Sequence, residues 1–336
     1  MNAASEAGHG ARARRSHSSL ALLLLALGAF VSVLLAVGIG SVPIGFAKLL
    51  AIVRGGGDTL DRTLVFDLRL PRALAAFATG GLLGVSGALM QVLLRNPLAD
   101  PYVLGLSGGA AVGALGAMLL GAAGGVVTGS ALVGALVSIL LVFGLAHGSG
   151  SWTATRLLLT GVVVASGWGA IVTFLLAIAP SERIPGMLYW LMGDLIYARS
   201  PWLALGVLAG ASILLLPLGR ALNVLARGPL QAAALGVAVR PLTWSVYLLA
   251  SALTAAAVTT SGSVGFVGLV VPHLLRLVLG NDQRVILPAA ALGGGVLLTL
   301  ADTVARTLLA PEQLPVGVIT AALGVPLFLY LLYRAK

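Results

Sequence analysis

The ionisable side chains that could do chemistry in this chain are few, and several lie at the ends of apolar runs. Charged residues make up 9% of the sequence. Asp302 and Arg306 are four residues apart, so in a helix they share one face and can form an ion pair. A carboxylate in an apolar environment could instead pass protons. Arg276 and Asp194 are the other ionisable groups near the ends of apolar runs, and for Asp302 the ion pair is the simpler interpretation.

No arrangement typical of a catalytic or metal site is found in the sequence. There is no cysteine, and the spacing of the four histidines (His9, His17, His147 and His273) fits no metal site. No grouping of serine, histidine and aspartate suggests nucleophilic catalysis. The only lysines are Lys48 and Lys336, and neither follows a glycine, so the phosphate-binding motifs GxxxxGKS and GxxxxGKT are absent. We therefore expect no catalytic residue, bound metal or cofactor, and any ATP that drives this protein must be hydrolysed by another subunit.

The composition is that of an integral membrane protein. The chain is 59% hydrophobic, and its mean hydropathy is +1.07. A helix needs roughly 20 apolar residues to cross a bilayer. Such runs recur through the chain and predict an all-α membrane protein with ten helices, at 19–41, 71–94, 101–120, 126–147, 156–179, 201–219, 242–260, 264–280, 285–304 and 315–334. Glycine pairs such as Gly80/Gly84 and Gly109/Gly113 predict close helix packing.

The basic residues indicate how these helices are oriented. An even number of crossings places both termini on one side, and that side holds twelve of the twenty Lys and Arg residues. By the positive-inside rule this side is the cytoplasm. Residues 1–18 are expected to form a disordered cytoplasmic tail, and 19–336 a single transmembrane domain. The first apolar run is longer than the core of a signal peptide, so a first membrane span is the better interpretation.

Two cytoplasmic segments break the apolar pattern. Residues 95–101 read RNPLADP, where two prolines stop a helix and Asp100 can cap the next one before Pro101. Residues 221–242 read ALNVLARGPLQAAALGVAVRPL. A short helix is predicted there, beginning at Pro229 and ending before Gly236.

Several blocks of the sequence together resemble the FecCD family. They are RLPRALAAFATGGLLGVSGALMQVLLRNPLADPYVLGLSGGAAVGA (69–114), RLLLTGVVVASG (156–167), GMLYWLMGDL (186–195), SGSVGFVGLVVPHLLRLVLGNDQRVILPAAALGGG (261–295) and LADTVARTLLAPEQLPVGVITAALGVPLF (300–328). This family comprises permeases of ATP-binding-cassette (ABC) importers for vitamin B12, ferric siderophores and haem. The resemblance implies the type II ABC importer permease architecture, with ten helices per subunit. It also implies a homodimer with the path at its interface, two ATP-hydrolysing subunits in the cytoplasm and a soluble substrate-binding protein outside.

The resemblance also implies roles for particular residues. An inner gate is expected at Asn96, Pro97, Leu98, Ala154 and Thr155. Ala154 departs from the small hydroxyl residues that are usual there, so Thr155 carries more of that expectation. Carboxylates of the binding protein are expected to dock on Arg69, Arg72 and Arg306, although these arginines could instead contact lipid headgroups or pair locally with Asp67 and Asp302.

The cytoplasmic segment near 221–241 is expected to couple to the ATPase. The matching residues are Arg227, Gly228, Pro229, Leu230, Gln231, Leu235 and Gly236. Pro229 stands where the family usually has glutamate, so a specific polar contact with the ATPase is not implied at this position.

The resemblance thus implies a non-enzymatic permease subunit in the bacterial inner membrane that imports a metal chelate. We expect this chain to bind no cofactor, and we expect ATP and Mg to be used by the partner ATPase. Expected partners are a second copy, two ATP-binding subunits, the binding protein and membrane lipid, and no nucleic acid. The alternative is a secondary transporter driven by an ion gradient, with Asp302 as its ionisable centre.

Overall fold

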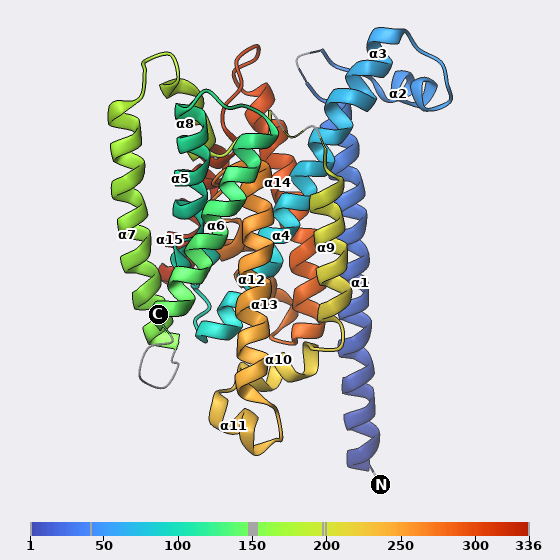
Figure 1. Ribbon diagram of the computed structural model, residues 1–336. Helices are drawn as coiled ribbons and strands as arrows, with labels where there is room; N and C mark the ends of the chain where they lie inside the picture. Colours follow the sequence, from blue (N-terminus) through green and yellow to red (C-terminus); the bar gives the residue numbers. More distant parts are fainter. Residues whose placement is uncertain (1, 41, 147–153, 197, 199, 335–336) are drawn as a thin grey trace.

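The computed structural model describes residues 2–40, 42–146, 154–196, 198 and 200–334, and these contain helices and connections without a strand (Figure 1). The longer helices are α1 (Asn2–Gly38), α4 (Leu70–Leu94), α5 (Leu106–Leu119), α6 (Gly125–Ala146), α7 (Ala154–Ile178), α9 (Trp202–Leu215), α12 (Val239–Ser261), α13 (Val267–Leu279), α14 (Gln283–Thr307) and α15 (Val316–Arg334). The shorter ones are α2 (Phe46–Val53), α3 (Thr59–Thr63), the π-helix η1 (Leu64–Arg69), the 3-10 helix η2 (Pro101–Leu104), α8 (Ile184–Met192), α10 (Gly219–Leu225) and α11 (Pro229–Ala234).

Each of the ten predicted apolar ranges overlaps one of the longer helices, so the all-α membrane architecture is confirmed. Six helices in the described part of the chain are long and apolar enough to cross a membrane, and α9 with α10, bent by 73°, can form a seventh span. The helices α5, α13 and α15 are apolar but shorter. The 14 residues of α5 rise only about 21 Å. The count of ten crossings therefore stays a prediction.

The first helix covers more of the chain than its predicted span. α1 begins at Asn2, so in the structure the range 2–18 is helical and continuous with the first apolar run. The alanines and arginines of this range are good helix formers. The division into a tail and one permease domain stays a prediction, as does the cytoplasmic side of the tail.

The second apolar helix starts earlier than expected. The sequence places Arg69 and Pro71 at its beginning, but helical structure is continuous over Thr59–Leu94. Proline lacks the N–H that a preceding carbonyl would accept, and a π-helical turn can absorb such a defect. The π-helix η1 ends at Arg69, two residues before Pro71. Arg69 and Arg72 are consequently fixed inside a long helix instead of standing in a connection.

The helix α4 is the centre of the bundle, and glycines allow its backbone to touch neighbouring helices. It is almost entirely buried and packs against α14, α12 and α13. A Cβ atom on Gly80 or Gly84 would overlap the carbonyl oxygen of Gly294 or Ala290 on α14. Gly109 on α5 is in the same close contact with Gly134 on α6. The close packing predicted from the glycine spacing is thus confirmed.

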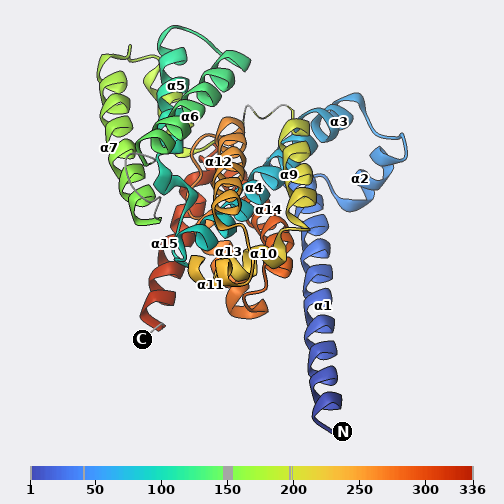
Figure 2. The ribbon, with the colours of Figure 1, turned by 60° about the horizontal axis from the view of Figure 1, so that its bottom comes forward.

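The remaining helices surround this centre in a fixed order. Figure 1 shows α5, α6 and α7 on one side of α4, and α1 and α9 on the other. The short helices α10 and α11 lie at the same end of the bundle as the N-terminus, while α2, α3 and α8 lie at the opposite end. Figure 2, turned to bring the lower end forward, keeps α10, α11 and α13 together. By the predicted orientation, the end with α11 is cytoplasmic and the other is the outer face.

The α4–α14 contact makes a testable prediction. Gly84→Ala should lower the free energy of unfolding by about 1–3 kcal/mol, because the added methyl group forces two tightly packed backbones apart. Gly206→Ala on α9 is the matched control, since a Cβ there meets nothing within 4 Å. Thermal unfolding in detergent, followed by size-exclusion chromatography, should show a lower midpoint only for Gly84→Ala. Equal midpoints for the two variants would contradict the close contact.

Candidate functional sites

A buried cluster of charged side chains lies at the outer end of α4 and α14. The Arg72 guanidinium donates from Nη2 to Asp302 Oδ1 at 2.8 Å and from Nε to both carboxylate oxygens at 3.1 Å. Its Nη1 donates to Gln313 Oε1 at 2.8 Å. The Asp302 side chain is 1% exposed, and Arg306 Nε lies 3.1 Å from its Oδ2. The predicted Asp302–Arg306 ion pair is confirmed, and Arg72 is a second cation on the same carboxylate.

The third arginine of this region binds the backbone. Arg69 donates to the carbonyl oxygens of Val37, at 3.1 Å, and Val42, at 2.5 Å. Asp67 is exposed, and no ion pair joins it to another described residue. Of the two local partners considered from the sequence, Asp67 therefore pairs with none of these arginines in the structure. The side chain of Arg69 instead reaches the end of α1, whose last carbonyls lack partners within their own helix.

The structure brings the three predicted docking arginines together, but with partners in their own chain. Arg69 and Arg306 are buried, and Arg306 Nη2 donates to the carbonyl oxygen of Ala36 at 2.9 Å. The Arg72 side chain is 12% exposed. Local pairing is thus the arrangement in the structure for Arg72 and Arg306, and docking stays a prediction. Asp194, 4.0 Å from Arg72, joins the cluster from the connection after α8, which the sequence could not reveal.

The inner turn after α4 has the local structure that its sequence predicts. Arg95 ends α4 in the left-handed region, with φ +50°. The Asn96 Oδ1 accepts a hydrogen bond from the Leu98 N–H at 2.9 Å, and Asp100 Oδ1 accepts from the Tyr102 N–H at 2.7 Å. The predicted Asp100 cap is confirmed, but the helix that it caps is η2, and α5 begins only at Leu106. Asn96, Pro97 and Leu98 are exposed.

The second predicted gate segment begins α7. Thr155 is exposed in the first turn of this helix. Ala154 is the first residue of α7, its side chain is outside the described part, and residues 147–153 are also outside it. The helix η2, which follows the inner turn, packs against α7, because a Cβ on Gly161 would lie 2.6 Å from the Val103 carbonyl oxygen. The two gate segments are therefore joined through neighbouring elements, while their role as a gate stays a prediction.

The predicted coupling segment contains the short helix expected from its sequence. It is α11, with Pro229 as its first residue and Gly236, at φ +78°, just beyond its end. Gly228 precedes it at φ +122°, a conformation that favours glycine. Leu230 is 85% exposed and Leu235 66% exposed. Arg227, Pro229 and Gln231 are also exposed. The predicted short helix is thus confirmed, while its role in coupling to an ATPase stays a prediction.

A hydrogen-bonded junction beside this segment could not be seen in the sequence. Asn223 on α10 donates from Nδ2 to Asp282 Oδ1 at 2.8 Å and accepts from the Gln283 N–H at 2.7 Å. Asp282 caps α14 by accepting from the Arg284 N–H at 3.0 Å. Hydrogen bonds from the Arg284 side chain lower the pKa of Asp282 to about 2. An aspartate before a predicted helix indicates a cap, so the role of Asp282 could be predicted from the sequence. Its partner Asn223 could not, because it lies 59 residues earlier.

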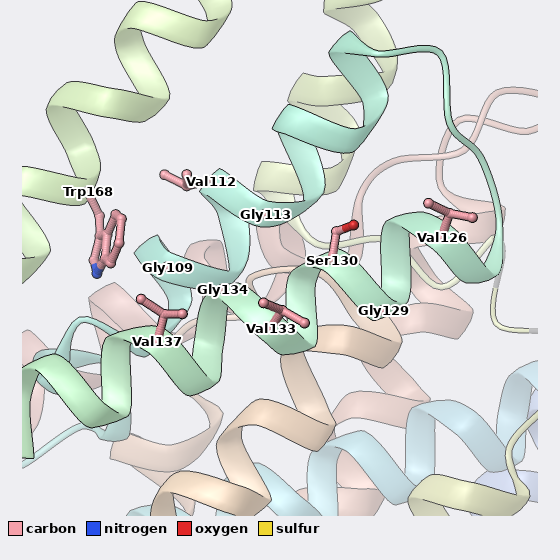
Figure 3. A pocket seen from close by; sticks show the side chains of 10 residues that line it. All are labelled: Gly109, Val112, Gly113, Val126, Gly129, Ser130, Val133, Gly134, Val137 and Trp168. Atoms are coloured by element: carbon pink, nitrogen blue, oxygen red, sulfur yellow. The ribbon is translucent and has the colours of Figure 1, made fainter.

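The helix α7 is the most exposed of the membrane-spanning candidates, although it is apolar. Its Trp168 donates from Nε1 to Ser138 Oγ on α6 at 2.9 Å. Figure 3 shows Trp168 at one side of a groove of about 520 Å³, lined mainly by glycine and valine on α5 and α6. The apolar surface of α7 can face lipid or a second copy of the chain. Within the described residues, no group of three or more His, Cys, Asp or Glu side chains could hold a metal ion.

Comparison with known proteins places these features in a family. Residues 25–334 match the model of the FecCD transport family. The chain is 44% identical over 278 residues to a cobalamin import system permease of Halobacterium salinarum, covering 81% of this chain and 73% of that one. It is 40% identical over 326 residues to a hemin transport system permease of Yersinia pestis, covering 93% and 96%.

A solved structure supports the same relationship. It is an inward-facing metal-chelate-type ABC transporter with a TM-score of 0.81 and 33% identity, covering 93% of this chain and 98% of that one. Because the family model matches nearly the whole chain and both relatives cover more than two thirds of it, this chain belongs to the FecCD transport family.

Proposed function

We propose that this chain is the membrane permease subunit of an ABC importer that moves a metal chelate into the cytoplasm. The observation that carries the proposal is the TM-score of 0.81 with a metal-chelate-type ABC transporter over 93% of the chain. The permeases from H. salinarum and Y. pestis transport cobalamin and hemin by name. The substrate is therefore a large chelate such as cobalamin, haem or a ferric siderophore. The membrane is the bacterial inner membrane, with both termini in the cytoplasm.

A secondary transporter driven by an ion gradient is the weaker alternative. Its ionisable centre would be Asp302, but two arginines already hold this carboxylate. A carboxylate that takes up and releases a proton during transport would have to give up these two ion pairs, and breaking a buried ion pair is costly. The contacts of Asp302 therefore support a structural role.

The import cycle assigns a separate role to each end of the molecule. Two copies of the chain enclose the path, with the exposed apolar helix α7 at or beside their interface. ATP and Mg are bound by two separate subunits, because the sequence has no phosphate-binding loop. These subunits receive α11, whose exposed Leu230 and Leu235 would enter an apolar groove. The inner turn and the start of α7 close the path in the resting state.

The outer end receives the substrate-binding protein. We propose that it contacts Arg69, Arg72 and Arg306. Each guanidinium would use the N–H groups that are not bonded to partners within the chain. Guanidinium groups held by a rigid framework suit carboxylates of a partner, since each can form two parallel hydrogen bonds. Such pairs act mainly on the association rate, so the affinity of the binding protein should fall as salt is raised.

Uptake of chelate into vesicles tests the proposed function. Transport of cobalamin, haem or a ferric siderophore should require ATP and both partner proteins, and the isolated chain should hydrolyse no ATP. Leu230→Ala should weaken attachment of the ATPase by about 30-fold, since burial of a leucine at an interface centre contributes about 2 kcal/mol. Leu120→Ala, at an 87% exposed leucine between α5 and α6, is the control. Uptake driven by an ion gradient without ATP would refute the assignment.

The gate makes a second prediction. The chain has no cysteine, so Leu98→Cys and Thr155→Cys each introduce a single thiol. Each thiol should crosslink to its counterpart in the second copy in the resting state, and less when nucleotide is trapped on the ATPase. Disulfides form only when the Cα atoms are within about 7 Å. Leu120→Cys should not crosslink in either state. If the crosslinking yield does not change when nucleotide is trapped, Leu98 and Thr155 have only a structural role.

The outer cluster makes a third prediction. Asp302→Asn keeps the shape of the side chain but leaves Arg72 and Arg306 without their shared negative charge. Removing one partner of a buried ion pair typically costs about 3–5 kcal/mol, so the thermal midpoint in detergent should fall clearly. Asp67→Asn, at an exposed aspartate on η1, should leave it unchanged. If both variants melt with the wild type, the cluster does not stabilise the fold.

A further inference from the structure

A cleft lies at the α11 end of the bundle, between the last turn of α4, the end of α10 and the connection from α13 to α14. Its volume is about 690 Å³, within the range of small-molecule sites. Four arginines line it: Arg95 just after α4, Arg227 just after α10, Arg276 on α13 and Arg284 in the first turn of α14. Figures 1 and 2 show α10, α11 and α13 grouped at this end.

The cleft has more positive than negative charge. Asp282 is the only carboxylate that lines it, and this group is already bound by Arg284 Nη2 at 2.7 Å and by Asn223 at 2.8 Å. Among the described residues, no carboxylate lies within 4.0 Å of Arg95, Arg227 or Arg276. Guanidinium groups gathered in one concave site repel each other unless an anion is present.

One of these arginines is fixed by the core. Arg276 on α13 donates from Nη1 to Gln91 Oε1 and from Nη2 to the Ala88 carbonyl oxygen at 3.3 Å, both on α4. Gln91 is buried and in turn donates to the carbonyl oxygen of Leu269 at 3.1 Å. A guanidinium that neighbouring groups hold in place loses little entropy when it binds an anion. Arg95 and Arg227 are exposed and can close on such an anion from the surface.

We propose that this cleft binds a phosphate group, which no part of the import cycle above requires. Arginine forks match phosphate oxygens in two parallel hydrogen bonds. The predicted orientation puts the cleft at the cytoplasmic surface, where basic pockets between helices bind anionic headgroups. The phosphate comes from an anionic phospholipid of the inner leaflet or from free phosphate. Pro97 of the inner turn also lines the cleft, so a bound phosphate contacts both the gate and the coupling segment.

The test uses the complete complex with its ATPase subunits. It is placed in nanodiscs of phosphatidylcholine mixed with phosphatidylglycerol, and the lipids that remain bound are identified by native mass spectrometry. Phosphatidylglycerol should be retained above its share of the mixture. Arg95→Gln and Arg227→Gln should each reduce this retention about tenfold, the effect of losing a charged hydrogen bond of about 1.4 kcal/mol.

Matched controls are available at the same end of the bundle. Arg220→Gln on α10 and Arg240→Gln on α12 remove the same charge from exposed arginines that do not line the cleft, and should retain phosphatidylglycerol as the wild type does. Displacement of the bound lipid by inorganic phosphate would identify free phosphate as a ligand, and resistance to it would identify the lipid.

Two results would overturn the proposal. One is equal retention of phosphatidylglycerol in the cleft and control variants. The other is loss of ATPase attachment in Arg227→Gln with no change in bound lipid or phosphate. In that case the cleft receives a carboxylate of the ATPase and binds no phosphate.

Discussion

The close approach of α4 and α14 is the contact on which the other features depend. Glycines let the two backbones touch along the middle of the bundle, so side chains at both ends of α4 are held at fixed positions. At the outer end Arg72 meets Asp302 of α14 at 2.8 Å. At the inner end α4 stops at Arg95 and leads into the turn that precedes η2. One rigid pair of helices thus connects the outer charged cluster to the inner turn.

Polar contacts determine how the packed helices align with one another. In the bundle interior, Ser86 of α4 donates to the Ala250 carbonyl oxygen of α12 at 2.8 Å, and Arg276 ties α13 to the inner end of α4. A buried polar group is costly when unpaired and specific when paired. These bonds therefore fix which faces of the glycine-rich helices meet, since small residues alone would allow several alignments.

The same pair of helices also links the two ends of the chain mechanically. Asn223 joins α10, next to the proposed coupling helix α11, to the cap of α14. A movement imposed on α11 would therefore reach α14 through hydrogen bonds and α4 through backbone contact. Packed helices of this kind move as units between discrete arrangements. Such a connection would suit the proposed import cycle, in which partners act on opposite faces of the membrane.

Local features could be predicted from the sequence, and distant pairings could not. The apolar ranges, the Asp302–Arg306 pair, the Asp100 cap and the helix starting at Pro229 depend on neighbours within a few residues, so periodicity and capping rules determined them. The sequence resemblance alone pointed to the family. Only the tertiary structure decided that Arg72 shares Asp302, 230 residues away, and that Arg69 binds carbonyls instead of Asp67. A charged side chain pairs with whichever group the packing of the helices brings within reach, and the local spacing of residues does not determine that packing.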